Sequence, residues 1–336
     1  MACPGREYVP CPAGYGCRVA DALDGVVLAL RALQIGDLLV AVPALRGLRR
    51  AYPTHRLVLA TPAPLAPLVA RIGGVDTLLP TPDPTAIAWT GRPPDVAVNL
   101  HGTGPQSHHA LETLRPVRRI GFHCTEAAAG WEGPDWPAVA AAHPHERARW
   151  CALLDAVGIP ADADDLYLDA PPHGPAGPVL VHPGAAFGAK RWPADRFAAV
   201  AAALERRGGR VLVTGSAAER GLADEVAAWA GLPAERVLAG DTDVGQLCDL
   251  VAVASLVISG DTGIAHLASA YATPSVALFG PVDPARWGPP AGGPHRALGD
   301  AAVRRGEPFA ADPDPALLAV AVDDVLEAAA AVHSSG

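Results

Sequence analysis

The sequence predicts an α/β protein in two halves, each with a parallel β-sheet flanked by helices. Short apolar runs of about four to six residues alternate with stretches of helical periodicity, which is the pattern of βα units. The length of 336 residues suits two domains of ordinary size. A segment rich in proline and glycine, residues 170–178, interrupts the alternation, which restarts directly after it. We therefore place a linker there.

The first half begins after residues 1–24, whose proline and glycine content predicts a flexible N-terminal tail. Apolar runs of strand length follow, separated by stretches with apolar residues at helical spacing. Together they predict a domain over residues 25–170. The expected strands are 26–30, 56–60, 95–100 and a short one around Ile120 and Phe122, and the expected helices are 37–50, 65–73 and 147–157.

The second half repeats the alternation more regularly and predicts a domain over residues 178–312, followed by a C-terminal helix within 313–336. The expected strands are 179–182, 210–214, 237–239, 256–259 and 275–279, and the expected helices are 194–207, 219–230, 244–253, 263–271 and 315–333. Open parallel sheets bind ligands at the carboxyl ends of their strands. The turns from strand to helix are therefore where functional residues should lie.

Composition and charge exclude several classes of protein. Hydrophobic residues make up 50% of the chain, which excludes a disordered protein, and the net charge of −9 argues against a nucleic-acid partner. No apolar run approaches the roughly 18–20 residues of a membrane span, and residues 1–24 lack the pattern of a signal peptide. We expect a soluble, cytoplasmic protein.

The six cysteines indicate neither a disulfide framework nor a metal site. Cys3, Cys11 and Cys17 lie in the tail without a nearby histidine, the others are scattered, and no CxxC pair occurs. A structural zinc ion needs four such ligands. We therefore expect no bound metal.

Asp261, Thr262 and Gly263 form a turn between an expected strand and an expected helix. Small residues let the backbone approach a ligand closely, and the N–H groups of a helix N-terminus favour a phosphate. His266 lies on the same helix face as Thr262 and Gly263. One interpretation is a phosphate site; the other is that Asp261 caps the helix and His266 packs in the core.

Lys190 is the single lysine among 26 basic residues, the rest being arginine. It follows a second small-residue turn, Gly184-Ala185-Ala186, which comes after the strand 179–182. Backbone N–H groups together with one compact ammonium suit an anionic leaving group. The alternative is a loop shaped by proline and glycine, with Lys190 in solvent.

Three further polar residues stand beside predicted strands or at helix starts. Asp37 would face the gap between the halves, where it suits a general base for a hydroxyl or, alternatively, a helix cap. Glu219 would either serve a helix dipole or accept ribose hydroxyls. His101 belongs to a group of six histidines between 101 and 145. These histidines could either line a polar pocket or occupy ordinary surface positions, and the sequence leaves both interpretations open.

Several familiar motifs are missing. Gly102-Thr103-Gly104 follows a strand but lacks the third glycine of the dinucleotide fingerprint, which argues against an NAD-dependent oxidoreductase. Residues 184–190 resemble a phosphate-binding loop until Arg191 replaces the hydroxyl residue that coordinates magnesium. No nucleophile-elbow GxSxG and no zinc-binding HExxH occurs.

Five segments in order resemble glycosyltransferase family 9, the heptosyltransferase family. They are IGDLLVAVPALRGLRRAYP (35–53), VHPGAAFGAKRWPADRFA (181–198), VTGSAAE (213–219), VLAGDTDVGQL (237–247) and ISGDTGIAHLASAYATPSVALFGPVDP (258–284). The resemblance covers roughly residues 26–290. It implies the GT-B fold, with two Rossmann-like domains facing across a cleft, acceptor binding in 25–170 and nucleotide-sugar binding in 178–312. It also implies inverting, metal-independent transfer, usually of heptose from an ADP donor, without a cofactor.

The resemblance also implies roles for individual residues. Asp37 resembles the catalytic base, and Lys190 the residue that neutralises the leaving diphosphate. His101 is a candidate for contact with the acceptor. The residues implied to bind the donor are Gly184, Ala185, Ala186, Lys190, Glu219, Leu238, Thr242, Asp261, Thr262, Gly263 and His266.

Donor and acceptor stay open at this point. Ala185 and Ala186 stand where many family members have serine or threonine, so an ADP-sugar and another donor such as a GDP-sugar both remain. Residues 1–170 carry 14 basic and 17 acidic residues, a net −3, which is unlike a surface for a phosphorylated lipid. We favour a small natural-product intermediate over a lipopolysaccharide-type glycan as acceptor.

A non-catalytic sugar-nucleotide-binding protein is the other class considered, and the presence of both Asp37 and Lys190 argues against it. We expect a monomer or weak dimer without nucleic-acid partners or membrane insertion.

Overall fold

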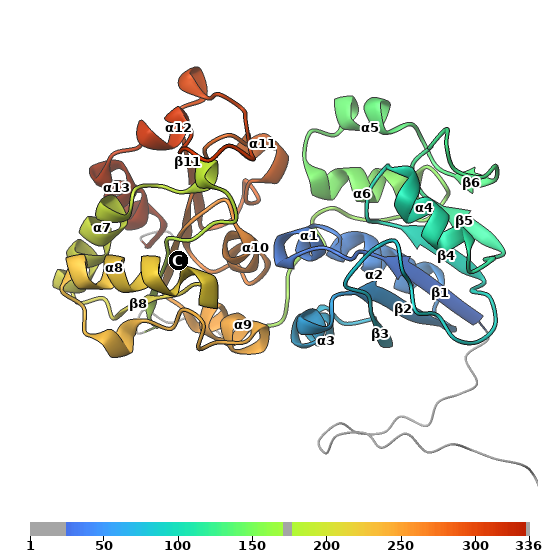
Figure 1. Cartoon of the computed structure of the whole chain (residues 1–336), viewed down its shortest axis with the longest axis horizontal. Helices are drawn as coiled ribbons and strands as arrows, with labels where there is room; N and C mark the ends of the chain where they lie inside the picture. Colours follow the sequence, from blue (N-terminus) through green and yellow to red (C-terminus); the bar gives the residue numbers. More distant parts are fainter. Residues whose placement is uncertain (1–24, 171–176, 334–336) are drawn as a thin grey trace, which may run out of the picture.

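The computed structural model describes residues 25–170 and 177–333. The predicted tail, with Cys3, Cys11 and Cys17, and most of the predicted linker lie outside these residues. Figure 1 shows two α/β units side by side, the first coloured blue to green and the second yellow-green to red. Within the described residues, no helix is long and apolar enough to cross a membrane.

The first unit contains a six-stranded sheet in the order β3-β2-β1-β4-β5-β6, with all strands parallel. The strands are β1 (Gly25–Leu30), β2 (His55–Thr61), β3 (Thr77–Pro80), β4 (Val96–Asn99), β5 (Arg118–Ile120) and β6 (Trp131–Glu132). The strand order reverses between β1 and β4, so the carboxyl ends of these two strands border the crevice where such sheets bind ligands.

The second unit contains a five-stranded parallel sheet in the order β11-β10-β9-β7-β8. The strands are β7 (Val179–His182), β8 (Val211–Val213), β9 (Leu256–Gly260), β10 (Ser275–Leu278) and β11 (His295–Leu298). The predicted strand 237–239 is reduced to a single parallel bridge between Val237 and Val213. Counting that bridge, both units have the same strand order, and the second reverses between β7 and β9.

Helices cover both faces of each sheet. In the first unit, α1, α2, α3 and α6 pack on one face and α4 on the other; in the second, α7, α8 and α13 pack on one face and α9 and α10 on the other. The helices are α1 (Ile35–Val40), α2 (Val42–Ala51), α3 (Ala66–Ile72), α4 (Pro105–Glu112), α5 (Trp136–Ala142), α6 (Glu146–Asp155), α7 (Ala194–Arg206), α8 (Arg220–Ala230), α9 (Val244–Val253), α10 (Gly263–Ala270), α11 (Pro284–Trp287), α12 (Pro315–Leu318) and α13 (Val322–His333).

Two predicted helices are each divided in the structure. The helix expected over 37–50 ends at Val40 and restarts at Val42, because Pro43 has no N–H and its ring excludes a continuous helix through that point. The helix expected over 315–333 is interrupted after Leu318, and the Asp324 carboxylate accepts a 2.8 Å hydrogen bond from the Ala321 N–H at the new start. The short elements β3, β6, α4, α5, α11 and β11 were not predicted.

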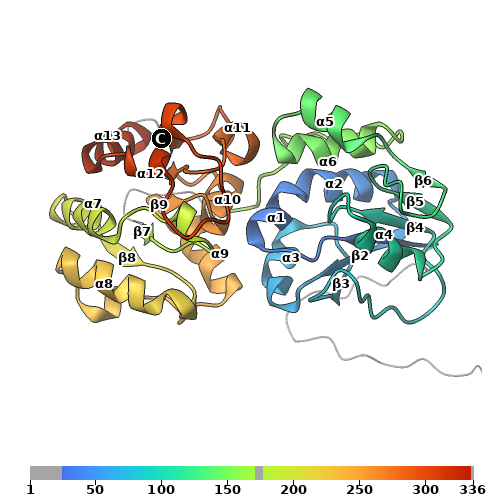
Figure 2. The ribbon, with the colours of Figure 1, turned by 45° about the horizontal axis from the view of Figure 1, so that its top comes forward.

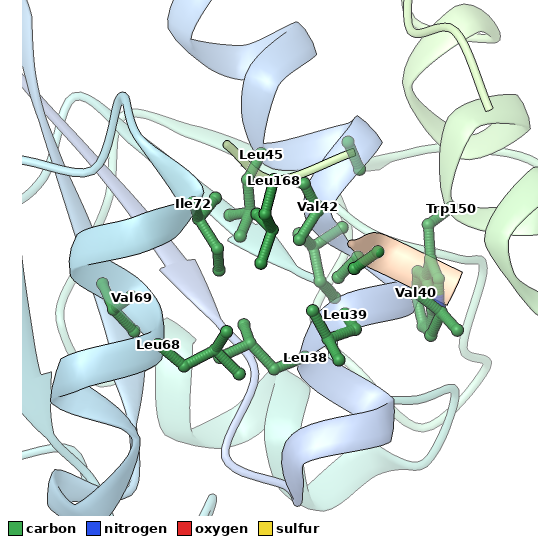
Figure 3. Packing of buried hydrophobic residues seen from close by; sticks show 14 of the residues in the cluster. Leu38, Leu39, Val40, Val42, Leu45, Leu68, Val69, Ile72, Trp150 and Leu168 are labelled. Atoms are coloured by element: carbon green, nitrogen blue, oxygen red, sulfur yellow. The ribbon is translucent and has the colours of Figure 1, made fainter. Parts of the chain in front are cut away.

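One hydrophobic cluster runs through both units. It includes residues of α1 and α3 from the first unit and of α9 and α10 from the second. Figure 3 shows its first-unit side. The residues labelled there are Leu38, Leu39, Val40, Val42, Leu45, Leu68, Val69, Ile72, Trp150 and Leu168. Because this apolar contact is continuous, the two sheets are held in a defined relation to one another.

Helices α1 and α10 meet at the centre of this contact, as the views in Figures 1 and 2 agree. Glycine allows the close approach: a Cβ on Gly263 would lie 3.1 Å from the Ile35 Cβ, and one on Gly36 would lie 2.7 Å from Cδ2 of His266. Polar contacts flank it. Arg71 pairs with Asp249 at 2.6 Å. The N-termini of both helices are thereby brought to the same place.

Candidate active site

A cavity of about 550 Å³ lies where the carboxyl ends of β1, β7 and β9 approach one another. Both units line it, the first through the start of α1 and the second through several loops. The lining residues are Gln34, Gly36, Asp37, His182, Ala185, Ala186, Phe187, Lys190, Glu219, Asp261, Thr262, Gly263, His266, Val282, Arg286, Trp287, Pro308 and Phe309. The cavity therefore collects side chains from both strand-order reversals.

Asp37 enters this cavity from the first turn of α1. Its Oδ2 accepts a hydrogen bond of 3.3 Å from the Gln34 N–H, so the helix-capping interpretation is partly realised. Its Oδ1 lies 3.6 Å from a guanidinium nitrogen of Arg31, and 29% of the side chain is exposed. The Gln34 N–H and the Arg31 guanidinium thus orient the Asp37 carboxylate, which remains accessible from the cavity.

Arg31 is a buried cation that sequence reasoning missed. Its Nε donates to the Asp37 carbonyl at 2.8 Å, its Nη1 donates to the Leu100 carbonyl, and its guanidinium stacks over Trp150 at 4.7 Å. Burial lowers the pKa of Arg31, and the nearby Asp37 and Glu146 carboxylates oppose that shift. Arg31 therefore fixes the backbone and side chain of Asp37 together.

Lys190 and Asp261 form an ion pair in the part of the cavity lining that the second unit contributes. The Nζ of Lys190 lies 2.7 Å from an Asp261 carboxylate oxygen, and only 6% of the Asp261 side chain is exposed. Lys190 ends a short 3₁₀ turn, Gly188–Lys190, and Asp261 follows β9. The ammonium is accordingly neither in bulk solvent nor a lone charge, and the sequence did not indicate this pairing.

The N-terminus of α10 forms the wall beside this ion pair. Thr262 occupies the cap position with an extended backbone, and Gly263 begins the helix. The first N–H groups of a helix have no partner within it and carry part of the positive end of its dipole. Ala185 and Ala186 also line the cavity. The start of α10 thus offers amide donors suited to phosphate oxygens.

Two histidines line the cavity in their neutral form. The His266 ring is packed edge-to-face against Trp287 at 5.7 Å, and burial lowers its pKa despite the nearby Asp261 and Asp37. His182, which sequence reasoning missed, ends β7, and its Nδ1 lies 3.1 Å from the Thr214 Oγ1. Burial also lowers the pKa of His182. Both rings can therefore exchange hydrogen bonds without adding charge.

Glu219 separates this cavity from a smaller one of about 260 Å³, which it also lines. Its Oε2 accepts 2.8 Å hydrogen bonds from the N–H and the hydroxyl of Ser216, so this carboxylate caps the start of the helix, a role that was not predicted from the sequence. No hydrogen bond within the described residues uses Oε1. Gly184 lets this carboxylate approach, because a Cβ there would lie 2.2 Å from Oε1.

The smaller cavity has both polar and apolar lining residues, namely Ile35, His182, Gly215, Ser216, Glu219, Thr242, Asp243, Val244, Leu247, Gly263 and Ile264. It shares His182, Glu219 and Gly263 with the larger cavity. The two spaces are therefore neighbours along one cleft.

No three histidine, cysteine, aspartate or glutamate side chains are gathered as a metal site anywhere in residues 25–170 and 177–333. Two of the three described cysteines are not poised for chemistry either, since burial raises the pKa of Cys151 to about 12 and that of Cys248 to about 11. The polar groups of the cleft are thus the ones available to a substrate.

Comparison with known proteins identifies the family. Residues 119–298, more than half of the chain, match the sequence profile described as Glycosyltransferase family 9 (heptosyltransferase). The chain belongs to glycosyltransferase family 9. It is therefore a glycosyltransferase, as the sequence motifs predicted. No curated protein sequence matches the chain.

Solved structures similar to this family 9 glycosyltransferase confirm the GT-B fold. E. coli ADP-heptose lps heptosyltransferase II is 23% identical with a TM-score of 0.75, covering 92% of this chain and 98% of that chain. A family 9 glycosyl transferase from Veillonella parvula is 18% identical with a TM-score of 0.74, covering 94% and 99%. E. coli heptosyltransferase WaaC with ADP is 18% identical with a TM-score of 0.67, covering 90% and 98%.

The residues singled out from the sequence of this glycosyltransferase fall into three groups. Nine line the larger cavity: Asp37, Ala185, Ala186, Lys190, Glu219, Asp261, Thr262, Gly263 and His266. Thr242 lines the smaller cavity. The others line neither: Gly184 lies behind Glu219, Leu238 packs against the apolar cluster between the units, and His101 is half-buried, with its N–H bonded to Asn99.

Proposed function

We propose that this enzyme is an inverting, metal-independent glycosyltransferase that moves a sugar from a nucleoside-diphosphate donor to an acceptor hydroxyl. ADP-heptose is the donor we favour, and a small soluble molecule, such as a natural-product intermediate, is the acceptor we favour over a lipopolysaccharide-type glycan. Family membership supports the reaction class. Similarity to structures described with ADP and with ADP-2-deoxy-2-fluoro heptose fits an ADP-linked donor.

The donor would extend along the cleft from the smaller cavity into the larger one. The nucleoside would lie beside Thr242, with the unused Oε1 of Glu219 accepting a ribose hydroxyl. The diphosphate would follow between the Ala185–Ala186 backbone and the start of α10, where amide N–H groups favour an anion. The sugar would then reach the part of the cleft that holds Asp37.

Asp37 would act as the base and Lys190 as the counterion of the leaving group. The acceptor oxygen loses its proton to the Asp37 carboxylate and forms a bond to the anomeric carbon. The bond from that carbon to the phosphate oxygen breaks, and its electron pair leaves with the nucleoside diphosphate. Attack from the side opposite the leaving group inverts the anomeric configuration.

Lys190 is held for this step by Asp261. Before the donor binds, the 2.7 Å ion pair offsets the charge of the ammonium in a partly buried site. When a diphosphate arrives, Lys190 can turn to it, and the Asp261 carboxylate can accept hydrogen bonds from sugar hydroxyls. This exchange of partners supplies positive charge where negative charge develops, without a metal ion.

The observation that carries the proposal is that a carboxylate of one unit and an ammonium of the other, Asp37 and Lys190, line one cavity. Thermal melting with ADP, GDP and NAD tests the donor class, because a ligand that binds only the native state raises Tm. ADP is expected to raise Tm most. Mass spectrometry with ADP-heptose and a panel of other nucleotide sugars then tests transfer or hydrolysis. If no nucleoside diphosphate raises Tm and no donor is consumed, the proposal is wrong.

A non-catalytic nucleotide-sugar-binding protein is the alternative. The same panel separates the two classes, since that protein would be stabilised by ADP or an ADP-sugar and would release no sugar from any donor. A GDP-sugar donor would be indicated by stabilisation with GDP in place of ADP.

A further inference from the structure

Two exposed phenylalanines meet at the mouth of the larger cavity. Phe187 and Phe309 are 40% and 75% exposed, although both line that cavity, and their rings pack edge-to-face with centroids 5.0 Å apart. Neither phenylalanine is part of the buried core. The contact between the two rings covers only part of their surface, and the apolar surface left in water calls for another explanation. Val282 and Trp287 add further apolar surface to the lining of this cavity.

The loop that carries Phe309 is fixed to the turn that carries Lys190. The Ala189 N–H donates to the Ala310 carbonyl at 3.0 Å, and the Asp314 N–H donates to the Ala189 carbonyl at 3.1 Å. Gly188 allows this contact, because a Cβ there would overlap the Ala311 carbonyl oxygen at 1.6 Å. The aromatic pair is therefore held beside the reacting end of the cleft.

Buried Asp314 closes the loop on itself. Its carboxylate accepts hydrogen bonds from the N–H groups of Arg305, at 3.2 Å, and Gly306, at 3.3 Å, and it also caps α12 through Ala316 at 2.9 Å. A closed loop of this kind presents its tip in a defined position. Phe309 is on that loop, so its exposure is built into the fold.

Arg286 adds a cation to the lining of the same cavity. It comes from α11 and lines the larger cavity, and its guanidinium makes no hydrogen bond or ion pair with any of the described residues. The other cation of the lining, Lys190, is paired with Asp261. A planar guanidinium beside aromatic rings suits a carboxylate or phosphate attached to a flat apolar group.

The mouth lies away from the nucleoside end of the cleft. Phe187, Arg286 and Phe309 line only the larger cavity, which also holds Asp37, and none of them lines the smaller one. A transferred sugar carries no charge over most of its surface, so Arg286, the second cation of the lining after Lys190, has no partner on the sugar. The molecule that meets this wall while its hydroxyl reaches Asp37 is the acceptor.

We infer that the wall formed by Phe187, Phe309 and Arg286 is the acceptor subsite, and that it takes an acceptor with a flat apolar ring and a nearby anionic group. This inference rests on the proposed glycosyl transfer and adds the acceptor's chemical class. It also assigns acceptor binding in part to the second unit, in addition to the first-unit residues expected from the sequence.

The test uses simple probes on the full chain saturated with ADP. 3-Phenylpropanoate combines ring and anion, 3-phenylpropan-1-ol keeps only the ring, and butanoate keeps only the anion. Ligand-observed NMR titration is expected to give the lowest Kd for 3-phenylpropanoate. Arg286→Gln should weaken that probe about tenfold and leave the alcohol unchanged, because one charge-assisted pair is lost. Phe309→Ala should weaken both ring-bearing probes.

Matched controls lie outside the cleft. Arg296→Gln removes another arginine, at a separate pocket lined by residues of β11 and α13, and Trp229→Ala removes another exposed aromatic ring. Neither should change any probe's Kd. ADP affinity, measured alone, should be the same in Arg286→Gln, Phe309→Ala and the parent chain.

Two results would overturn the inference while the proposed function stands: equal affinity for the acid and the alcohol with no effect of either mouth variant, or weaker ADP binding in Arg286→Gln, which would assign this arginine to the donor. If ADP does not bind the parent chain, the donor site itself is wrong, and the proposed function and the inference fail together.

Discussion

The ion pair between Lys190 and Asp261 makes the sharpest prediction about this site. Replacing Lys190 with Met keeps most of the side-chain volume and removes the charge. The Asp261 carboxylate, 6% exposed, then loses the ammonium at 2.7 Å and has no other side-chain partner among the described residues. Removing one member of a buried ion pair is costly because the other is left charged and poorly solvated.

The size of the loss follows from the burial of the two partners. Breaking a buried pair costs about 3–5 kcal/mol, and we expect the lower end, about 3 kcal/mol, because the pair borders a water-accessible cavity. Asp261→Asn leaves the more exposed partner, whose side chain is 24% exposed, and should cost about 1 kcal/mol. The double variant should recover part of the loss of Lys190→Met, since no unpaired charge remains.

Urea unfolding measures these stabilities, and calorimetric titration of ADP measures the functional side. Lys190→Met should weaken ADP binding by at least about tenfold, because a charge-assisted contact is replaced by an unpaired carboxylate. Asp261→Asn should not weaken ADP binding, because it removes the competitor for Lys190. The reasoning is refuted if Lys190→Met is as stable as the parent chain, or if both single variants lose ADP affinity equally.

Three further predictions concern other parts of the molecule. Glu219→Gln should weaken ADP binding about tenfold but leave 2′,3′-dideoxy-ADP unchanged, because only the ribose contact is lost; equal losses for both nucleotides in calorimetry would contradict the ribose role. Gly36→Ala should cost about 1–3 kcal/mol in urea unfolding, because its Cβ would lie 2.7 Å from the His266 ring, which Trp287 backs. Gly221→Ala, on an open helix surface, is the control and should be neutral or stabilising; a Gly36→Ala variant as stable as the control would count against the close packing of α1 and α10. Burial lowers the pKa of His295 to about 4, so its folded form resists protonation. Stability should therefore fall as pH drops below about 6.5, where the unfolded chain takes up the proton, and the contribution levels off below the folded value; His295→Gln should flatten that slope in urea unfolding, and an unchanged slope would show that this ring does not contribute.

The regular elements could be predicted because their signals are local. The bounds predicted for the strand 179–182 and the helix 244–253 agree with β7 and α9, since an apolar run and a capped amphipathic stretch each carry their own limits. Where a proline interrupts a periodic stretch, as at Pro43, periodicity alone gave one helix instead of two. The elements missed entirely are short or begin at proline, as α4 does at Pro105, and a few residues carry too little pattern.

The site could be predicted only in its motif-bearing part. Asp37, Lys190 and Asp261 stand in short segments whose residue types already indicate anion and hydroxyl chemistry. Which residues pair with them in space is not indicated by any such segment. Lys190 and Asp261 are 71 positions apart, and Arg31 stacks on a tryptophan far along the chain. Each pairing therefore exists only once the sheet of its own unit has formed. Phe309 belongs to an irregular loop, where no periodicity distinguishes a placed ring from a solvated one.

The most direct test of the central claim is a single-turnover comparison of the parent chain with Asp37→Asn, using an ADP-sugar that the parent chain consumes. A general base contributes about 10²–10⁴ to the rate, so the variant should transfer sugar at least about a hundredfold more slowly. Its ADP affinity should not fall, because ADP brings no acceptor hydroxyl to Asp37 and the substitution removes a negative charge from the cavity that Asp37 lines. A variant that transfers sugar at the parent rate would contradict the claim that this carboxylate takes the acceptor's proton.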